Sequence, residues 1–387
     1  MQTGTVTISR RATDRILAGH PWIYRTDVEK AEAEPGAVVR LMDGRKRFWG
    51  QALYSDKSQI AVRLLTREER TFDRTFLAER IAAAAAWRRE IVGDAQAYRL
   101  VASEGDRLPS LIIDRYGDRF VMQTLSQGTD RWKPMLIEIL QEQFNAKTII
   151  ERNDVPVRKL EGLMEQKGVL AGEPVTEVAI HENGVIFHFD LLAGQKTGGF
   201  LDQRENRAAA RERARGRALD CFCYGGGFAL TVASRCESVL GVDSSAEALA
   251  LARRNQELNG ISNVEWKEAN CFDFLKAADH DGLRFDTVIV DPPAFAPQRS
   301  NVEPALRGYK ELNLRALKIL NPGGFLVTCS CSFHVSEADF LEAVASAALD
   351  AHRQVVVVER RTQSRDHPIL LTVPETHYLK CLILRVL

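Results

Sequence analysis

The sequence predicts an α/β protein whose C-terminal half forms a doubly wound, Rossmann-like sheet. From Arg217 onward, short apolar runs alternate with helical segments. Each run is continuous, as in parallel strands that are buried on both faces. The runs are ALDCF (218–222), VLGV (239–242), TVIV (287–290) and FLVT (325–328). Successive strand–helix units of this kind place a ligand site at the carboxyl ends of the strands.

The clearest helix between these runs is expected over residues 245–259. Ser244 and Ser245 can both cap its N-terminus, because their hydroxyls accept hydrogen bonds from the first backbone N–H groups. Gly260 suits the left-handed position that follows a helix. The strand–helix pattern therefore has defined ends as well as the expected periodicity.

The N-terminal part of the chain predicts two smaller folds. Residues 1–70 contain short β-rich runs and turns such as Asp43-Gly44, which indicate a small β-barrel. The strands expected there are 5–9, 37–41, 48–53 and 59–65. Residues 71–190 indicate a central α+β domain, and the parallel sheet then occupies residues 191–387. The elements expected in the central domain are a helix within 70–93, strands within 98–125, a helix over 133–144 and a strand over 148–151.

Composition excludes several classes of protein. The 387 residues are 45% hydrophobic and 27% charged, as in ordinary globular proteins, and unlike collagen-like, disordered or disulfide-scaffold chains. No apolar run reaches the roughly 18 residues of a membrane span, and no signal peptide is evident. The seven cysteines are odd in number and include two C-x-C pairs, which is not a disulfide framework. We therefore expect a cytoplasmic protein with no membrane partner.

The formal net charge of zero conceals an asymmetry. Residues 1–70 contain 13 Lys and Arg against 9 Asp and Glu, so the rest of the chain is correspondingly acidic. A basic N-terminal part is suited to contact with a polyanion.

A glycine-rich loop follows the first strand of the predicted parallel sheet. It reads Tyr224-Gly225-Gly226-Gly227-Phe228, and a helix is expected to begin within it. Glycines let backbone N–H groups approach a ligand, and a helix N-terminus carries partial positive charge. The dinucleotide pattern G-x-G-x-x-G fails, because Leu230 stands at its sixth position, and no Walker A lysine follows. A plain turn is the alternative.

Polar residues follow the second and third strands as well. Asp243, with Ser244 after it, can bind both hydroxyls of a ribose, although it could instead cap the next helix. After the short strand 264–267, Asn270 could bond the edge of an adenine and Phe272 could stack on it. A loop for an amino-acid moiety, an acid for a ribose and a site for adenine are what an S-adenosylmethionine pocket requires.

The next two strands end in residues that can perform chemistry. The fourth ends in Asp291-Pro292-Pro293, and the prolines fix the loop that carries the carboxylate. The fifth ends near Cys329 and Cys331. A cysteine at the mouth of a site can act as a nucleophile in its thiolate form. Along an extended strand both cysteines point to the same face, so alternation does not choose between them.

With these motifs in view, the chain resembles the bacterial 23S ribosomal RNA large subunit methyltransferase I family over essentially its whole length. Members of this family use S-adenosylmethionine to form 5-methylcytosine. The matching segments are Gly19–Tyr24, Tyr54-Ser55, Ile60–Arg63, Glu104–Asp106, Ile113–Gly117, Glu151–Asp154, Gly194–Arg204, Tyr309–Asn313, Asp366–Pro368 and Tyr378–Lys380. The resemblance implies an RNA-binding PUA domain over 1–70, a central α+β domain over 71–190, and a class I methyltransferase domain over 191–387.

The resemblance also assigns roles to particular residues. The family pattern Thr, apolar, Ser, Cys, Ser at the last catalytic strand aligns its cysteine with Cys331, so Cys331 and Asp291 are the expected catalytic residues. Gly225 replaces the usual threonine, which should loosen the turn, and Asn270 replaces a frequent aspartate. The residues expected to hold the cofactor are Phe222, Tyr224, Gly225, Gly226, Asp243, Ser244, Asn270, Cys271, Phe272, Asp291, Gln203 and Arg204. Those expected to contact the substrate are Pro292, Phe295, Arg307, Tyr309 and Lys310, and no metal ligand is expected.

The implied reaction is addition of the Cys331 thiolate to C6 of a cytosine, followed by methylation at C5, with Asp291 bonded to the N3/N4 edge. Phe295 or Tyr309 could stack on the base, whereas Arg307 and Lys310 suit phosphates or a solvated helix face equally. The expected partner is 23S rRNA, free or in a partly assembled large subunit, and the family often forms homodimers. Three alternatives stay open: methylation of a base nitrogen without a covalent step, a non-catalytic RNA-binding assembly factor and, more remotely, a nicotinamide oxidoreductase.

Overall fold

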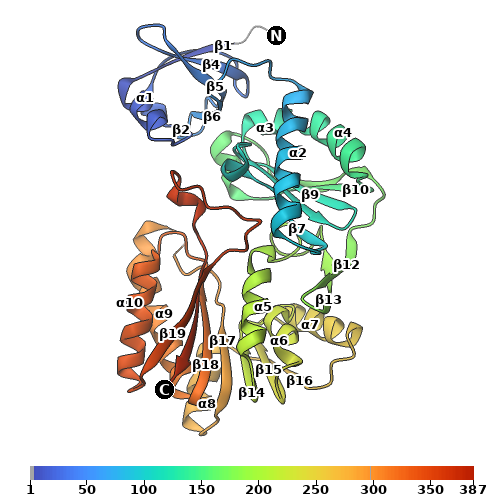
Figure 1. Ribbon diagram of the computed structural model, residues 1–387, viewed down its shortest axis with the longest axis vertical. Coiled ribbons are helices and arrows are strands. Elements are labelled where there is room, and N and C mark those ends of the chain that lie inside the picture. Colours follow the sequence, from blue (N-terminus) through green and yellow to red (C-terminus); the bar gives the residue numbers. More distant parts are fainter. Residues whose placement is uncertain (1–3, 297) are drawn as a thin grey trace. The chain divides into compact units, whose positions relative to one another are not determined.

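The computed structural model describes residues 4–296 and 298–387 and consists of two compact units (Figure 1). The first unit contains the described residues up to Ile180, together with Phe189–Leu201 and Arg365–Thr376. The second contains His181–His188, Asp202–Ser364 and His377–Leu387. Among the described residues, no helix has both the length and the apolar character needed to traverse a bilayer.

The first unit begins with a six-stranded sheet in the order β2-β6-β5-β4-β1-β3. Its strands are β1 (Gly4–Ile8), β2 (Trp22–Ile23), β3 (Val28–Glu32), β4 (Val38–Asp43), β5 (Phe48–Tyr54) and β6 (Val62–Thr66). Helix α1 (Arg10–Leu17) starts at Ser9, whose hydroxyl accepts a hydrogen bond from the Ala12 N–H group. The expected strands are present, but β6 starts later than predicted. The reason is local: the hydroxyls of Ser55 and Ser58 bond nearby backbone N–H groups and form a turn there.

A five-stranded sheet in the order β11-β10-β9-β8-β7 forms the rest of the first unit. The elements are α2 (Arg74–Ile91), β7 (Ala97–Ala102), β8 (Leu111–Tyr116), β9 (Arg119–Thr124), α3 (Gln127–Arg131), α4 (Lys133–Phe144), β10 (Thr148–Asn153) and β11 (Gln166–Gly172). The apolar sides of α2 and α4 share one hydrophobic core with the sheet. The helix predicted over 133–144 coincides with α4.

A late segment of the chain, Arg365–Thr376, belongs to the first unit although it lies near the C-terminus in sequence. Asp366 accepts hydrogen bonds from the guanidinium of Arg88 and, through Oδ2, from the backbone N–H of Arg99. Thr372 donates its hydroxyl to the carbonyl of Gly19. A separate pair of strands, β12 (Glu177–Glu182) and β13 (Val185–Asp190), covers the residues at which the chain first passes from one unit to the other.

The second unit is built on a seven-stranded sheet in the order β16-β15-β14-β17-β18-β20-β19. The strands are β14 (Arg217–Cys221), β15 (Ser238–Asp243), β16 (Val264–Glu268), β17 (Phe285–Val290), β18 (Leu320–Ser330), β19 (Val355–Thr362) and β20 (Lys380–Val386). The helices are α5 (Arg204–Arg213), α6 (Gly227–Ala233), α7 (Ala246–Leu258), α8 (Cys271–His280), α9 (Val302–Lys318) and α10 (Glu337–Asp350). The first five strands in chain order run parallel, which confirms the predicted Rossmann-like fold, whereas β20 is antiparallel to β18 and β19.

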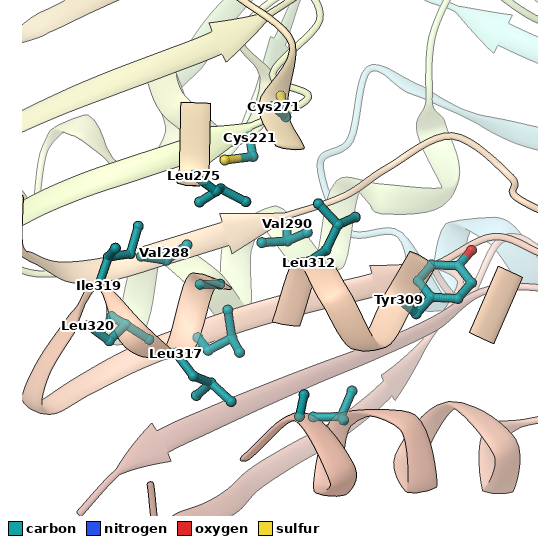
Figure 2. Packing of buried hydrophobic residues seen from close by; sticks show 14 of the residues in the cluster. Cys221, Cys271, Leu275, Val288, Val290, Tyr309, Leu312, Leu317, Ile319 and Leu320 are labelled. Carbon is teal, nitrogen blue, oxygen red and sulfur yellow. The ribbon is translucent and has the colours of Figure 1, made fainter. Parts of the chain in front are cut away.

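Helices α8, α9 and α10 cover one face of this sheet and bury a continuous apolar core (Figure 2). In Figure 2, Tyr309 lies at the right of this core, Ile319 and Leu320 lie at the left, and Cys221 and Cys271 lie at the top. Phe340 on α10 is fully buried, and its ring packs against Tyr309 with 5.2 Å between the ring centroids. The core therefore reaches the carboxyl edge of the sheet and supports the loops that follow the strands there.

This packing predicts that Phe340→Ala destabilises the second unit far more than Leu349→Ala on the same helix. Truncating a buried aromatic side chain costs about 3–5 kcal/mol, because a cavity remains. Leu349 is 75% exposed, so its truncation should change the free energy of unfolding by only about 0.5 kcal/mol. Urea unfolding of the full chain measures both values. Equal losses in the two variants would contradict the packing described here.

Candidate active site

The carboxyl ends of adjacent parallel strands lie level with one another at one edge of the second unit's sheet. Cys221, the last residue of β14, pairs with Val242 of β15 and with Val290 of β17. Val290 in turn pairs with Thr328 of β18. The residues that follow these positions therefore emerge at the same edge, as the sequence predicts.

The glycine loop after β14 adopts left-handed backbone conformations that position the start of α6. Gly226 has a φ of +81° and occupies the N-cap position. A Cβ atom at Gly226 would lie 2.7 Å from the ring of Trp266, so the loop requires glycine there. At Gly225 a Cβ would lie 2.9 Å from a methyl group of Leu251. Close packing of α7 against the loop therefore explains why glycine stands at position 225. The sequence alone did not indicate this explanation.

Asp243 ties this loop to the end of β15. Its Oδ2 accepts the backbone N–H of Tyr224 at 2.9 Å, and its Oδ1 accepts that of Ser245 at 3.0 Å. The N-cap of α7 is Ser245, whose hydroxyl accepts the Ala248 N–H group, whereas Ser244 is exposed. Asp243 is therefore not the helix cap, and its carboxylate is half-buried at the edge of the sheet.

The segment after β16 contributes an aromatic ring and a helix cap. Asn270 caps α8, because its Oδ1 accepts hydrogen bonds from the N–H groups of Phe272 and Asp273. The Phe272 ring packs against those of Phe222 and Phe295. Cys271 was expected to bind the cofactor, but its side chain lies in the core, where its sulfur accepts the Phe222 N–H at 3.2 Å. Only the backbone of Cys271 could therefore face a ligand.

Asp291, directly after β17, is held by Gln203. The Gln203 Nε2 group donates to Asp291 Oδ2 at 2.9 Å, while its Oε1 accepts the side-chain amide of Asn206 at 2.7 Å. Arg361 Nε donates to Asn206 Oδ1 at 3.0 Å. The structure thus brings the expected residues Gln203 and Asp291 together. Asn206 is fully buried, and no motif in the sequence points to it. Arg204, which follows Gln203 in the chain and was also expected at the site, has a buried side chain.

The structure separates the two cysteines that alternation along a strand could not distinguish. Cys329 lies inside β18 opposite Cys381 and is fully buried. The hydrogen bond between these two thiols and the burial raise the pKa of Cys329 well above its usual range. Cys331 follows the last residue of the strand and is half-buried, with its sulfur 3.7 Å from the Pro292 carbonyl oxygen. Of the two, Cys331 has the exposure that a nucleophile needs.

Ser332 connects the cysteine segment to the loop after β17. Its hydroxyl oxygen accepts the backbone N–H groups of Phe295 and Ala296 at 3.0 and 3.1 Å, and lies 2.9 Å from the Tyr309 hydroxyl. Lys380 donates to the Ser332 carbonyl at 2.7 Å. These contacts hold Cys331 beside the Asp291-Pro292 segment. They could not be foreseen from the sequence, because they join four separate segments of the chain.

The structure corrects one expected substrate contact. Tyr309 cannot stack on a base, because its side chain is buried between the rings of Phe295 and Phe340. Phe295 is half-buried, and Arg307 is exposed on α9. Lys310 forms a 2.7 Å ion pair with Asp350, so a phosphate would have to compete with that carboxylate.

Asp243 and Asp291 give this edge of the sheet a negative potential, and a third carboxyl group, that of Asp220, is buried near them. Asp220 lies inside β14, fully buried, and its Oδ2 accepts the Ala229 N–H at 2.8 Å. Burial raises the pKa of Asp220 well above its usual range, and the charges of Asp291 and Asp243 raise it further. The other carboxyl oxygen, Oδ1, has no hydrogen-bond partner among the described residues. Such a site fits a cationic ligand such as S-adenosylmethionine, with its sulfonium and ammonium groups. Within the described part of the chain, no group of three or more His, Cys, Asp or Glu side chains could hold a metal ion.

Comparison with known proteins gives two matches to family models. Residues 6–67 match a PUA-like domain, and residues 165–385 match the S-adenosylmethionine-dependent methyltransferase family. Among curated proteins, the ribosomal RNA large subunit methyltransferase I of Shewanella denitrificans is 42% identical over 378 residues, which cover 95% of both chains. The protein of the same name from Tolumonas auensis is 40% identical over 99% of both chains.

Solved structures share the whole fold at low sequence identity. A protein from Streptococcus mutans assigned as a SAM-dependent methyltransferase is 20% identical, with a TM-score of 0.82 over 99% of this chain and 100% of that chain. A second, assigned as a methyltransferase and crystallised in complex with SAH, is also 20% identical, with a TM-score of 0.85 over the same shares.

The different surroundings of the cysteines predict which of them reacts. In the folded chain at pH 7.5, iodoacetamide should modify Cys331, while Cys329 and Cys271 stay protected, because alkylation needs an accessible thiolate. Peptide mass spectrometry after short exposures gives the rate for each cysteine, and the denatured chain provides the fully reactive reference. Equal rates at Cys329 and Cys331 in the folded chain would contradict the site geometry.

Proposed function

Because this chain belongs to the ribosomal RNA large subunit methyltransferase I family of S-adenosylmethionine-dependent enzymes, we propose that it methylates C5 of a cytosine in 23S rRNA through a covalent bond between Cys331 and C6. The observation that carries the proposal is the half-buried Cys331 sulfur, 3.7 Å from the Pro292 carbonyl oxygen at the carboxyl edge of the sheet. The methyltransferase fold and the use of S-adenosylmethionine are properties of the family.

Residues at the ends of three strands would each bind a different part of the cofactor. When bound, S-adenosylmethionine supplies a methyl group on a positively charged sulfur. Asp243 would accept hydrogen bonds from the ribose hydroxyls, for which each carboxylate oxygen has a second lone pair. The N–H groups of the glycine loop at the start of α6 would receive the carboxylate of the amino-acid moiety. Phe272 would pack against the adenine ring.

The chemical task of Cys331 follows from the weak nucleophilicity of cytosine C5. The Cys331 thiolate would form a bond to C6, and the electrons of the C5–C6 double bond would then be available at C5 for its bond to the methyl group. A base would next remove the proton from C5, and the resulting electron pair would restore the double bond and expel the thiolate. Asp291, oriented by Gln203, would hydrogen-bond the N3/N4 edge and stabilise the base in its protonated form.

The N-terminal part of the first unit supplies a candidate RNA contact. It matches a PUA-like domain, and residues 1–70 carry an excess of basic side chains. Electrostatic attraction to phosphates would contribute affinity without sequence preference. Because C6 is inaccessible in a stacked and paired base, the target cytosine must be single-stranded or extruded.

Methylation of a base nitrogen is the second candidate, because the segment Asp291-Pro292-Pro293 could orient an amino group without a covalent step. Sites of that kind usually have an aromatic residue directly after the prolines, whereas here Ala294 precedes Phe295. The nearby cysteine also has no task in that chemistry.

Replacing the nucleophile tests the covalent route directly. Cys331→Ala should abolish methyl transfer to RNA from a strain that lacks this protein, since no other group would activate C5, and should leave S-adenosylhomocysteine binding unchanged. Cys236→Ala is the matched control, because Cys236 is half-buried on the loop after α6 and should leave turnover unchanged. Labelled methyl transfer and calorimetry measure the two properties. Near-normal turnover of Cys331→Ala would favour nitrogen chemistry, and no transfer by the unmodified chain would favour an assembly factor.

A modified base distinguishes carbon from nitrogen as the acceptor. RNA with 5-fluorocytosine at the target should form a stable covalent complex with the chain, because a fluorine at C5 cannot leave as a proton does and the thiolate is not expelled. Denaturing electrophoresis detects the complex, and Cys331→Ala should not form it. Methylated fluorocytosine RNA without any covalent complex would contradict the C5 route.

The role given to Asp243 predicts a loss of cofactor affinity. Asp243→Asn should weaken S-adenosylhomocysteine binding by about 10- to 100-fold, since hydrogen bonds to charged groups contribute about 1.5–3 kcal/mol. Calorimetry measures the affinity, with Asp273→Asn as the control, because Asp273 lies within α8, one turn after the cap residue. Equal affinities for the Asp243 variant and the unmodified chain would exclude a ribose contact.

A further inference from the structure

Lys380 is a buried cation beside the proposed nucleophile. It is the first residue of β20, pairs with Ser330 across the sheet, and is 2% exposed. Its ammonium group donates to the backbone carbonyls of Ser332 at 2.7 Å and Tyr378 at 3.0 Å. These two carbonyls take two of its three donors and leave one for another acceptor.

A lysine at this depth needs a physical reason. Desolvation of an ammonium group is costly, and burial accordingly lowers the pKa of Lys380 to about 8. Negative charge on Cys331, and then on Glu337, opposes that decrease. Both hydrogen-bond acceptors are carbonyls without a net charge. A nearby anion would therefore offset the desolvation cost of the ammonium group more fully than these carbonyls do.

We propose that Lys380 is a positioning residue that fixes the Ser332 carbonyl and, through its positive charge, favours the thiolate form of Cys331. Ser332 follows Cys331 directly and also bonds the loop that carries Phe295. Lys380 would thus both hold the backbone next to Cys331 and favour the ionised form of its sulfur. The inference rests on the proposed function only for the task of Cys331, because ionisation of the thiol is measurable without RNA or methyl transfer.

Other titratable groups face this pair from three further elements. Glu337 begins α10, Tyr309 lies on α9, and Asp291 follows β17. Burial raises the pKa of Tyr309, and a charge on Cys331 raises it further, so this hydroxyl stays neutral near pH 7. Glu337 and Asp291 are acidic and would disfavour a thiolate. Lys380 is therefore the group among these that can stabilise negative charge on the sulfur.

The test is the pH profile of alkylation at Cys331 in the full chain, mapped by mass spectrometry. Lys380→Met removes the charge but keeps the length of the side chain. This substitution should move the midpoint of the Cys331 alkylation profile upward by about one pH unit, which corresponds to about ten-fold slower alkylation near pH 7. Lys380→Arg should keep a midpoint close to that of the unmodified chain. Lys318→Met is the matched control, because Lys318 lies on α9 with a 43% exposed side chain and should change nothing.

A purely structural role would give a different result. If Lys380→Met left the midpoint unchanged, or if Lys380→Arg shifted it as far as Lys380→Met, the proposal would be overturned. Loss of methyl transfer in Cys331→Ala would still support the proposed function in that case, so the two failures are distinguishable. Circular dichroism and S-adenosylhomocysteine binding show whether each variant is folded.

The reciprocal measurement covers the case in which Lys380→Met does not fold. Coupling between two ionisable groups acts equally in both directions. Cys331→Ser removes a half-buried thiol with little change in shape, and it should lower the titration midpoint of Lys380, followed by NMR of the ¹³C-labelled lysine Cε. An unchanged Lys380 midpoint in Cys331→Ser would overturn the proposal.

Discussion

The register of the parallel strands in the second unit is the constraint on which the candidate site depends. Because Cys221, Val242 and Val290 are paired across β14, β15 and β17, the residues that follow them meet at one edge of the sheet. A shift of one residue in any of these pairings would turn the side chains of that strand to the opposite face. The buried apolar residues on the face covered by α8, α9 and α10 disfavour such a shift, and the core therefore sets the positions of the polar groups.

The same edge brings together groups that repel one another when charged. Asp220, Asp243 and Asp291 interact closely enough to raise the pKa of the buried Asp220. Because Asp243 and Asp291 bring negative charge to this edge, a sulfonium compound bound there would gain favourable electrostatic interactions. Gln203, itself held by the side-chain amide of Asn206, donates a hydrogen bond to Asp291 and so orients its carboxylate without adding charge.

On the other side of the edge, Ser332 performs an equivalent function for the cysteine. Its hydroxyl is bonded by two backbone N–H groups of the loop after β17, and its carbonyl by Lys380. Since Cys331 directly precedes Ser332, these contacts hold its backbone beside the segment that contains Asp291 and Pro292. Holding this segment in place in advance would lower the entropic cost of the proposed covalent step.

The sequence by itself determined the type of fold and the positions of the motifs. Continuous apolar runs predicted the parallel strands, capping residues predicted the ends of α7, and the glycine loop, Asp243 and Asp291 were all identified from their places after strands. These features are local, since each depends on residues within a few positions of one another.

Only the tertiary structure decided which of these residues can act. Cys331 differs from Cys329 because β18 ends at Ser330. Tyr309 lies in the core because aromatic rings pack on both sides of it. The side chain of Cys271 is buried, and its sulfur accepts the Phe222 N–H group. Ser332 and Lys380 lie in segments that resemble the family, but the sequence did not show what these two residues or Asn206 contact. Their importance arises from contacts between distant segments, such as that of Asn206 with Arg361, 155 residues away, and such contacts exist only once the sheet has formed.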